Sequence, residues 1–232
     1  MNLLAIETAA SILSVAVLKN KEIFVSETIA GTKHSELVME LIDVLMKKAA
    51  LEPKDLNGIL CMGGPGSFTG LRIGYSIAKG LALSLSIPFA PVPTLECIVN
   101  NERFKQGITL AVIEARKNAC FNAFFKDGNR LSEDKDSELS QITDEIAQYV
   151  KDGEKITLTG YGANVLYETL PDEFKANITL VDENEGYAKE LIAIAESKNL
   201  FSNDCTANLY SGPEYIRKTD AEIAKELEAP TR

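Results

Sequence analysis

The spacing of the first three β-rich runs constrains the fold of this chain most strongly. The runs cover residues 3–8, 11–18 and 22–29, and only two or three residues separate each run from the next. Gaps this short leave no room for a crossover helix, so neighbouring strands have to pair antiparallel as a β-meander. An apolar helix over residues 33–50 follows, with Thr32 as its expected N-cap.

The order of elements that begins with this meander occurs twice. In the first half we expect a strand at 57–62, a helix at 70–85, a strand at 89–91 and a helix from residue 94. The second half has three strands between 108 and 139, then helices at 142–150, 163–170 and 186–199 separated by strands at 155–160 and 178–181. A repeated β-β-β-α-β-α-β-α unit predicts an α/β fold of two lobes, each with a mixed sheet and flanking helices. We assign residues 1–103 and 104–217 to the two lobes and 218–232 to a charged tail.

The charge and hydropathy of the chain exclude several classes of function. It has 34 acidic and 24 basic residues, a net charge of −10. An acidic chain is repelled by phosphate backbones, so we expect contact with tRNA or other nucleic acid only through a partner. Apolar runs fall short of the roughly 18 residues that span a bilayer, and the N-terminus lacks the basic start of a signal peptide. We therefore expect a cytoplasmic protein that does not contact membranes.

The candidate metal ligands are few and far apart. The chain has four cysteines, Cys61, Cys97, Cys120 and Cys205, and one histidine, His34. Because a structural zinc site needs four clustered nitrogen or sulfur ligands, we expect reduced thiols and no metal site.

Two helices carry more apolar surface than one sheet needs to cover. In the helix at 33–50 the charged residues form one narrow stripe, and nearly every other position is apolar. The helix at 70–85 has only two charged residues, Arg72 and Lys79. Small residues at four-residue spacing form a groove along this second helix (Gly70, Gly74, Ala78, Ala82), and an apolar ridge runs beside it (Ile73, Ile77, Leu81, Leu85).

Two explanations account for this excess of apolar surface. Both helices could be covered on all sides by their own chain, or one face could cover the sheet while another face binds a second subunit. We expect the second arrangement, because contiguous apolar surface on a soluble protein marks an interaction site. The predicted interface residues are His34, Leu37, Val38, Leu41, Ile42, Leu45, Ile73, Gly74, Ile77, Ala78, Leu81 and Ala82.

A glycine-rich segment separates the strand at 57–62 from the helix at 70–85. It is not a Walker loop, because no Gly-Lys-Ser/Thr ends it, and it lacks the glycine two positions before the serine of a nucleophile elbow. We expect a tight turn capped by Ser67 or Thr69, in which glycines permit close packing. Anion binding by its backbone is the alternative. The candidate residues are Gly63, Gly64, Pro65, Gly66, Ser67, Phe68, Thr69, Gly70 and Arg72.

Several motifs together resemble one known family. They are Leu-Leu-Ala-Ile-Glu-Thr at 3–8, His-Ser-Glu at 34–36, the glycine-rich segment through residue 74, Glu-Ala-Arg at 114–116 and Gly-Pro-Glu-Tyr-Ile-Arg at 212–217. This combination, which spans most of the chain, is similar to the TsaB (YeaZ) family.

The resemblance implies the ASKHA fold, which actin, sugar kinases and Hsp70 share. It implies a role in forming threonylcarbamoyladenosine at position 37 of tRNAs that read codons beginning with A. In that pathway a related catalytic subunit, TsaD, would pair with this chain through the helices at 33–50 and 70–85, and the ATPase TsaE would join them. It also implies that the isolated chain could form a homodimer, and that ATP or ADP would be bound only in the complex.

The chain departs from catalytic ASKHA proteins at the phosphate-binding positions. Such enzymes usually have Asp-x-Gly-Ser/Thr after the first strand, whereas this chain has Glu7-Thr8-Ala9-Ala10-Ser11, and Arg116 stands where the second lobe would need a glycine. We therefore expect a non-catalytic subunit, with His34 in an interface or capping role. An acid pair of Glu7 and Glu114, an ASKHA-type ATP-dependent phosphotransferase and a peptidase-like hydrolase are the alternatives.

Overall fold

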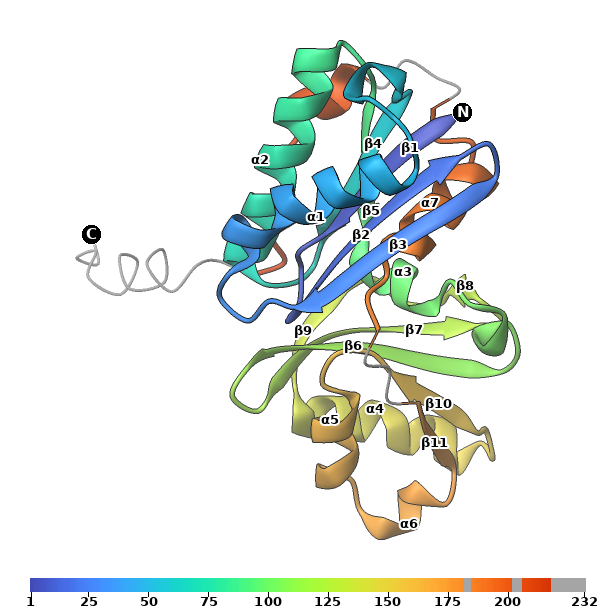
Figure 1. Ribbon diagram of the computed structural model, residues 1–232. Coiled ribbons are helices and arrows are strands. Elements are labelled where there is room, and N and C mark those ends of the chain that lie inside the picture. Colours follow the sequence, from blue (N-terminus) through green and yellow to red (C-terminus); the bar gives the residue numbers. More distant parts are fainter. Residues whose placement is uncertain (182–184, 202–205, 218–232) are drawn as a thin grey trace, which may run out of the picture.

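The computed structural model describes residues 1–181, 185–201 and 206–217, which form two lobes (Figure 1). The strands of the first lobe are β1 (Asn2–Glu7), β2 (Ile12–Lys19), β3 (Glu22–Ile29), β4 (Gly58–Gly64) and β5 (Phe89–Pro93). They form one sheet in the order β3-β2-β1-β4-β5. The first three strands pair antiparallel, as the short gaps between them predict, and β4 and β5 extend the sheet in parallel.

Helices α1 (His34–Lys48) and α2 (Phe68–Leu85) cover one face of this sheet. Alternate residues of a strand point to opposite faces, so β1 and β2 contribute to two different cores. The core under α1 and α2 contains Leu4, Ile6, Leu13, Val15 and Val17. The core on the opposite face contains Leu3, Ala5, Ala16 and Leu18.

The second lobe repeats the plan of the first. Its strands are β6 (Ile108–Arg116), β7 (Ala119–Lys126), β8 (Asn129–Arg130), β9 (Lys135–Glu138), β10 (Ile156–Thr159) and β11 (Ile178–Val181). The sheet runs β11-β10-β6-β7-β8, and β9 also pairs with β7. Its outer face is covered by α4 (Leu139–Lys151), α5 (Ala163–Thr169) and α6 (Asp172–Lys175).

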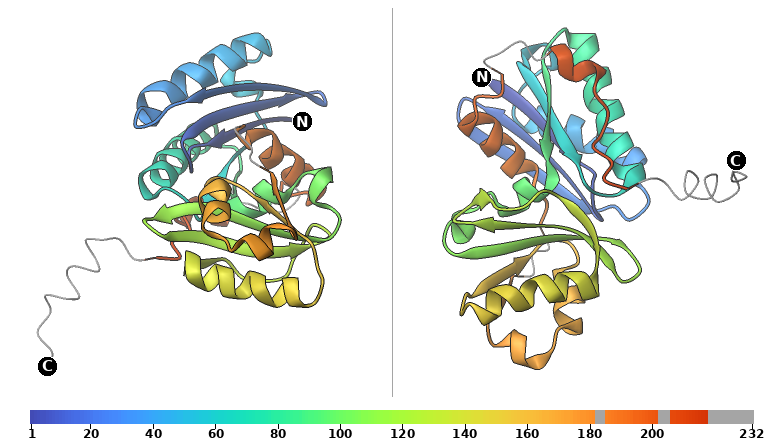
Figure 2. Two further views of the ribbon diagram at one scale, coloured as in Figure 1. Left: turned by 90° about the horizontal axis from the view of Figure 1, so that it is seen from below. Right: turned by 180° about the vertical axis from the view of Figure 1, so that it is seen from behind.

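The last helix crosses back to the first lobe. Helix α7 (Ala188–Ser197) packs on the face of the first sheet that α1 and α2 leave open, beside α3 (Thr94–Val99), as the rear view in Figure 2 shows. Its buried residues Leu191 and Ile192 join Phe125 of the second sheet in one core between the lobes. The short helix η3 (Thr206–Tyr210) then lies against β5. The expected second lobe of 104–217 is therefore wrong in its last part, because the apolar face of α7 covers the first sheet.

The sequence predicts most elements with small errors at their ends. β3 and β11 have the expected bounds, whereas α6 and β8 were not expected. Ser67 is the N-cap of α2, as predicted, and its hydroxyl oxygen accepts a hydrogen bond from Gly70 N. Thr32 is not the cap of α1, because that helix begins one residue later and Lys33 occupies the N-cap position without a side-chain hydrogen bond.

The cysteines within the described residues are free and buried, whereas Cys205 and the tail at 218–232 lie outside them. Burial raises the pKa of the Cys61 and Cys97 thiols well above the ordinary value, and that of Cys120 to about 11. The described part of the chain contains no helix long and apolar enough to cross a membrane. It also brings no three His, Cys, Asp or Glu side chains together as metal ligands.

Candidate docking face and inter-lobe cleft

The glycine-rich segment is a tight turn pressed against the link between β1 and β2. Thr8 Oγ1 donates to the Gly70 carbonyl oxygen over 2.7 Å, and Ser67 N donates to the Ala9 carbonyl oxygen over 2.8 Å. A Cβ atom at Gly70 would collide with the Thr8 carbonyl oxygen, and one at Gly74 would lie 2.6 Å from Thr8 Oγ1. These glycines are therefore required by close approach of the backbone, which confirms the predicted packing role.

The other side of this turn is covered by the C-terminal segment 211–217, which sequence reasoning did not connect to it. Glu214 N donates to the Gly63 carbonyl oxygen over 2.8 Å, and Gly64 adopts φ +115° where a Cβ would collide with Glu214. The Phe68 and Tyr215 rings stack with centroids 4.5 Å apart. Such contacts, 143 or more residues apart in the chain, leave no periodic signal in the sequence.

Arg72 fastens that segment to α2. Its guanidinium carbon lies 3.9 Å from the centre of the Phe68 ring, and its Nε donates to Tyr215 Oη over 3.1 Å. Lys79, the other charge on α2, donates to the carbonyl oxygen of Ser211. Both charges of this helix are thus used within the chain.

Seven of the twelve predicted interface residues are buried: His34, which lines a cavity between the lobes, and six that lie on the inner sides of their helices. These six are buried in the first lobe, so their side chains are not accessible to a partner. Their assignment to an interface is therefore corrected. A small side chain on α2 marks close approach to the sheet of its own lobe, which explains the groove that the sequence suggested. The six are Val38, Ile42, Leu45, Gly74, Ala78 and Ala82.

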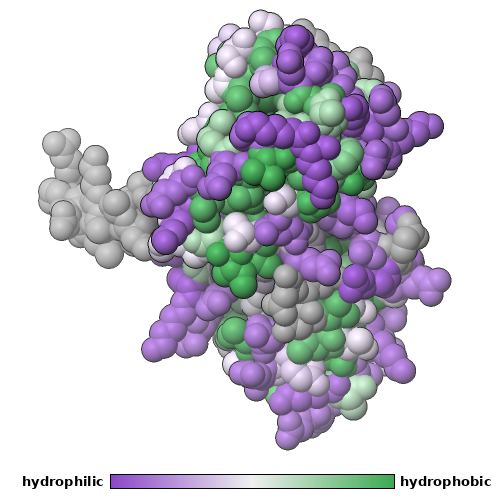
Figure 3. Space-filling model, viewed as in Figure 1, coloured by the Kyte–Doolittle hydropathy of each residue, from purple (hydrophilic) through white to green (hydrophobic). Residues whose placement is uncertain are grey.

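The remaining apolar residues leave a partly open strip where α1 and α2 approach each other. Leu37, Leu41 and Val44 share one side of α1 by their spacing, and Ile73, Ile77 and Leu81 share one side of α2. Val44, which sequence reasoning missed, is 54% exposed, and the other five are half-buried. We call these six residues the α1–α2 face. Figure 3 shows apolar patches among charged residues on this side of the first lobe.

A cavity of about 740 Å³ lies between the lobes. The first lobe contributes Ala9, Ala10, Ser11 and the start of α2, and the second lobe contributes Glu114, Tyr161 and Asn164. His34 also lines it, at 6% exposure, and its Nε2 has no hydrogen-bond partner among the described residues. His34 does not cap α1, whose N-cap is Lys33.

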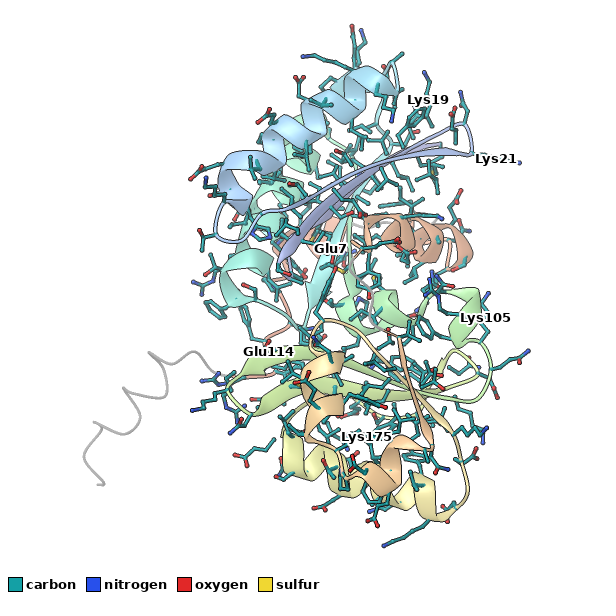
Figure 4. The ribbon with its side chains drawn as sticks, turned by 60° about the horizontal axis from the view of Figure 1, so that its bottom comes forward. Glu7, Lys19, Lys21, Lys105, Glu114 and Lys175 are labelled. Atoms are coloured by element: carbon teal, nitrogen blue, oxygen red, sulfur yellow. The ribbon has the colours of Figure 1, made fainter. Side chains whose placement is uncertain are left out.

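The acidic and basic candidates of the cleft lie in different surroundings. Arg116 Nη1 forms an ion pair with Asp136 over 2.7 Å. Glu114 is exposed at the cavity, whereas Glu7 is completely buried at the end of β1; Figure 4 labels both. The carboxylates that act on the pKa of Glu7 are Glu27 and Glu190 rather than Glu114, so the structure gives no support for an acid pair of Glu7 and Glu114.

Glu7 is instead hydrogen-bonded to two residues from later in the chain, Tyr161 after β10 and Tyr187 before α7. Its Oε1 lies 2.9 Å from Tyr161 Oη, and its Oε2 accepts a hydrogen bond from Tyr187 N. Burial raises the pKa of Glu7 from 4.5 to about 8, the two hydrogen bonds oppose this shift, and the nearby carboxylates of Glu27 and Glu190 add to it. Sequence reasoning missed this role, because nothing in the first strand indicates where Tyr161 lies.

Two lobes of one repeated plan, joined across a central cavity, define the class of actin-like, or ASKHA, proteins. A family model described as "TsaD: tRNA N6-adenosine threonylcarbamoyltransferase" matches residues 19–225. Among curated proteins, the chain is similar to TsaB of Bacillus subtilis (27% identity, 99% of each chain) and to TsaB of Escherichia coli (31% identity, 70% of this chain and 73% of the relative). The chain belongs to the TsaB (YeaZ) family, as its motifs predict.

Solved structures agree on the fold. YeaZ from Pseudomonas aeruginosa matches with a TM-score of 0.75 at 19% identity, over 92% of this chain and 99% of the other. A second structure, described as an uncharacterized protein with similarity to peptidase YEAZ from the same organism, has a TM-score of 0.78 at 19% identity over 93% and 99%.

Proposed function

We propose that this chain is a non-catalytic subunit for forming threonylcarbamoyladenosine at position 37 of tRNAs that read codons beginning with A. In this proposal it binds the related catalytic subunit TsaD through the α1–α2 face, and TsaE joins the pair. The relatives from B. subtilis and E. coli both carry the name tRNA threonylcarbamoyladenosine biosynthesis protein TsaB.

The α1–α2 face is the observation that supports docking. Its six apolar side chains are more exposed than the core beneath them, although covering the sheet requires only the inner side of each helix. A related subunit with the same fold would present similar helices, and a stable pair buries about 800 Å² on each side. An isolated chain could use the same face to form a homodimer.

The non-catalytic assignment is supported by what the reactive groups already do. Glu7 is buried and bonded to Tyr161 and Tyr187, and Arg116 is paired with Asp136. The pKa values of Cys61, Cys97 and Cys120 are raised by burial, which disfavours the nucleophilic thiolate. In this proposal the catalytic groups, and any bound ATP or ADP, belong to the complex.

The remaining partner assignments follow from charge. A net charge of −10 disfavours direct binding of tRNA, so tRNA reaches this chain through the catalytic partner. Because tRNA modification of this kind acts on cytosolic tRNA, we propose the cytoplasm as its location.

A matched pair of substitutions tests the docking face. Val44→Asp places a charge on the face, whereas Met39→Asp places the same charge on the other flank of α1, and the two positions are 54% and 48% exposed. We expect Val44→Asp to weaken binding to TsaD at least tenfold in titration calorimetry, with Met39→Asp unchanged and both variants folded by circular dichroism. Equal binding by both variants would refute the face.

The cavity of about 740 Å³ favours one other function, an ASKHA-type phosphotransferase. Calorimetric titration of the isolated chain with ATP distinguishes the two. Binding at micromolar concentration together with phosphate transfer would replace the scaffold proposal.

A further inference from the structure

The hydroxyl of Tyr161 has more hydrogen-bond acceptors than protons. Its Oη lies 2.9 Å from Glu7 Oε1 and 3.0 Å from the carbonyl oxygen of Glu185. A tyrosine hydroxyl carries one proton, and a carbonyl oxygen can only accept. If Glu7 were ionised, one of these two oxygen pairs would face each other without a hydrogen between them.

A proton on Glu7 resolves this count. Within donor distance, the Tyr161 hydroxyl can reach either acceptor. If Glu7 carries a proton on Oε1, that proton can occupy the 2.9 Å gap and be donated to Tyr161 Oη, which leaves the Tyr161 proton for the carbonyl oxygen of Glu185. The other carboxyl oxygen, Oε2, still accepts from Tyr187 N. Every polar atom of the cluster then has a partner, as buried polar groups require.

The surroundings favour the neutral acid. Glu7 is completely buried, and the charged groups that act on it are the carboxylates of Glu27 on β3 and Glu190 on α7. The α3 group that interacts with it is the buried thiol of Cys97. Burial also raises the pKa of the Tyr161 hydroxyl, so Tyr161 keeps its proton.

The cluster stands where the chain passes between the lobes. Glu7 ends β1 of the first lobe, Tyr161 follows β10 of the second, and residues 185–187 lead into α7. Gly186 brings this segment against β2, where a Cβ atom would collide with Ser14. One carboxyl group therefore joins both lobes and the crossing helix.

We propose that Glu7 is held as a neutral carboxylic acid that fastens the second lobe and α7 to the first lobe, and that loss of this proton to solvent loosens the junction. The role of the family in tRNA modification does not by itself require a protonated Glu7. Tyr161 also lines the cavity between the lobes, so the junction and the cavity share this residue.

Glu7→Gln tests the protonation state by the sign of its effect. The amide is neutral, and its NH₂ can donate to Tyr161 Oη while its oxygen accepts from Tyr187 N, so it imitates the acid. The native state keeps the proton up to about pH 8, whereas the unfolded chain releases it near 4.5, so wild-type stability falls as pH rises through this window. We expect the folded-to-unfolded ratio of Glu7→Gln relative to wild type to rise by about tenfold per pH unit between pH 5 and 8.

Denaturant unfolding of the full chain at pH 5, 6.5, 8 and 9 measures this ratio. Glu40→Gln, at an exposed position of α1, is the matched control and should show no such trend. An ionised Glu7 would give the opposite result, with Glu7→Gln less stable than wild type at pH 8 and 9.

Carbon-13 NMR of glutamate side chains gives a second readout that does not depend on stability. Through-bond assignment of the wild-type side chains identifies the Glu7 carboxyl signal, so this measurement needs no variant. We expect this signal to be that of a protonated acid at pH 6.5. In Tyr161→Phe, which lacks the hydroxyl that Glu7 contacts, the signal should titrate at a changed pH. A Glu7 signal that titrates below pH 5.5 overturns the proposal, even if the variants fail to fold.

Discussion

The two faces of the first sheet are covered in different ways. On one face, α7 arrives from the second lobe and closes an apolar core in which Leu191 and Ile192 are fully buried. On the other face, α1 and α2 bury their inner sides but leave Leu37, Leu41 and Val44 half-buried or exposed. The difference between the two faces therefore lies in the flanks of the helices, which α7 buries and which α1 and α2 leave partly exposed, rather than in total apolar content.

Ala78→Arg should have the largest effect, because Ala78 is completely buried on the inner side of α2. Placing an unpaired charge there costs about 4 kcal/mol or more, enough to unfold many domains of this size. Gly80→Arg adds the same side chain to an exposed position of the same helix, where nothing lies within 4 Å of a Cβ atom. We expect urea unfolding to show a large loss for Ala78→Arg and no loss for Gly80→Arg; equal stability would mean that α2 is turned the other way.

Leu191→Ala comes next and breaks the opposite face. Removal of this buried side chain should lower the free energy of unfolding by about 3 kcal/mol. Leu83→Ala, where the side chain is 62% exposed, should change it by less than about 0.5 kcal/mol. Thermal unfolding followed by near-ultraviolet circular dichroism compares the two, and a small effect at Leu191 would contradict the closure of the sheet by α7.

Gly70→Ala should have the smallest effect of the three, about 2 kcal/mol, because its methyl group forces the turn away from Thr8. Gly80→Ala is the control and should instead stabilise the chain by about 0.5 to 1 kcal/mol through helix propensity. Denaturant midpoints distinguish the two signs. A neutral Gly70→Ala would show that the close approach to the link between β1 and β2 is not needed.

The sequence predicts the parts of this fold that depend on neighbouring residues. The short gaps of the meander, the apolar period of α1 and the cap at Ser67 are local signals, and each appears in the structure. The return of α7 to the first lobe, the contact of Tyr215 with Phe68 and the burial of Glu7 depend on pairing between distant segments. A single sequence carries no periodic signal for such pairing.

The small residues of α2 were assigned to the wrong side of the helix. Gly74, Ala78 and Ala82 suggested an approach of a second helix, but the structure places them against the sheet of their own lobe. The neighbouring larger residues Ile73, Ile77 and Leu81 lie on the flank. Small residues at four-residue spacing on a soluble helix are therefore better interpreted first as contacts with the strand beneath them.

Hydroxyl-radical footprinting of the chain with and without TsaD measures which surface the partner covers. We expect lower oxidation at Leu37, Leu41, Val44 and Ile77 in the complex, with Leu131 and Val165 of the second lobe unchanged. Unchanged oxidation at the α1–α2 face, with new protection on the second lobe, would contradict docking through this face.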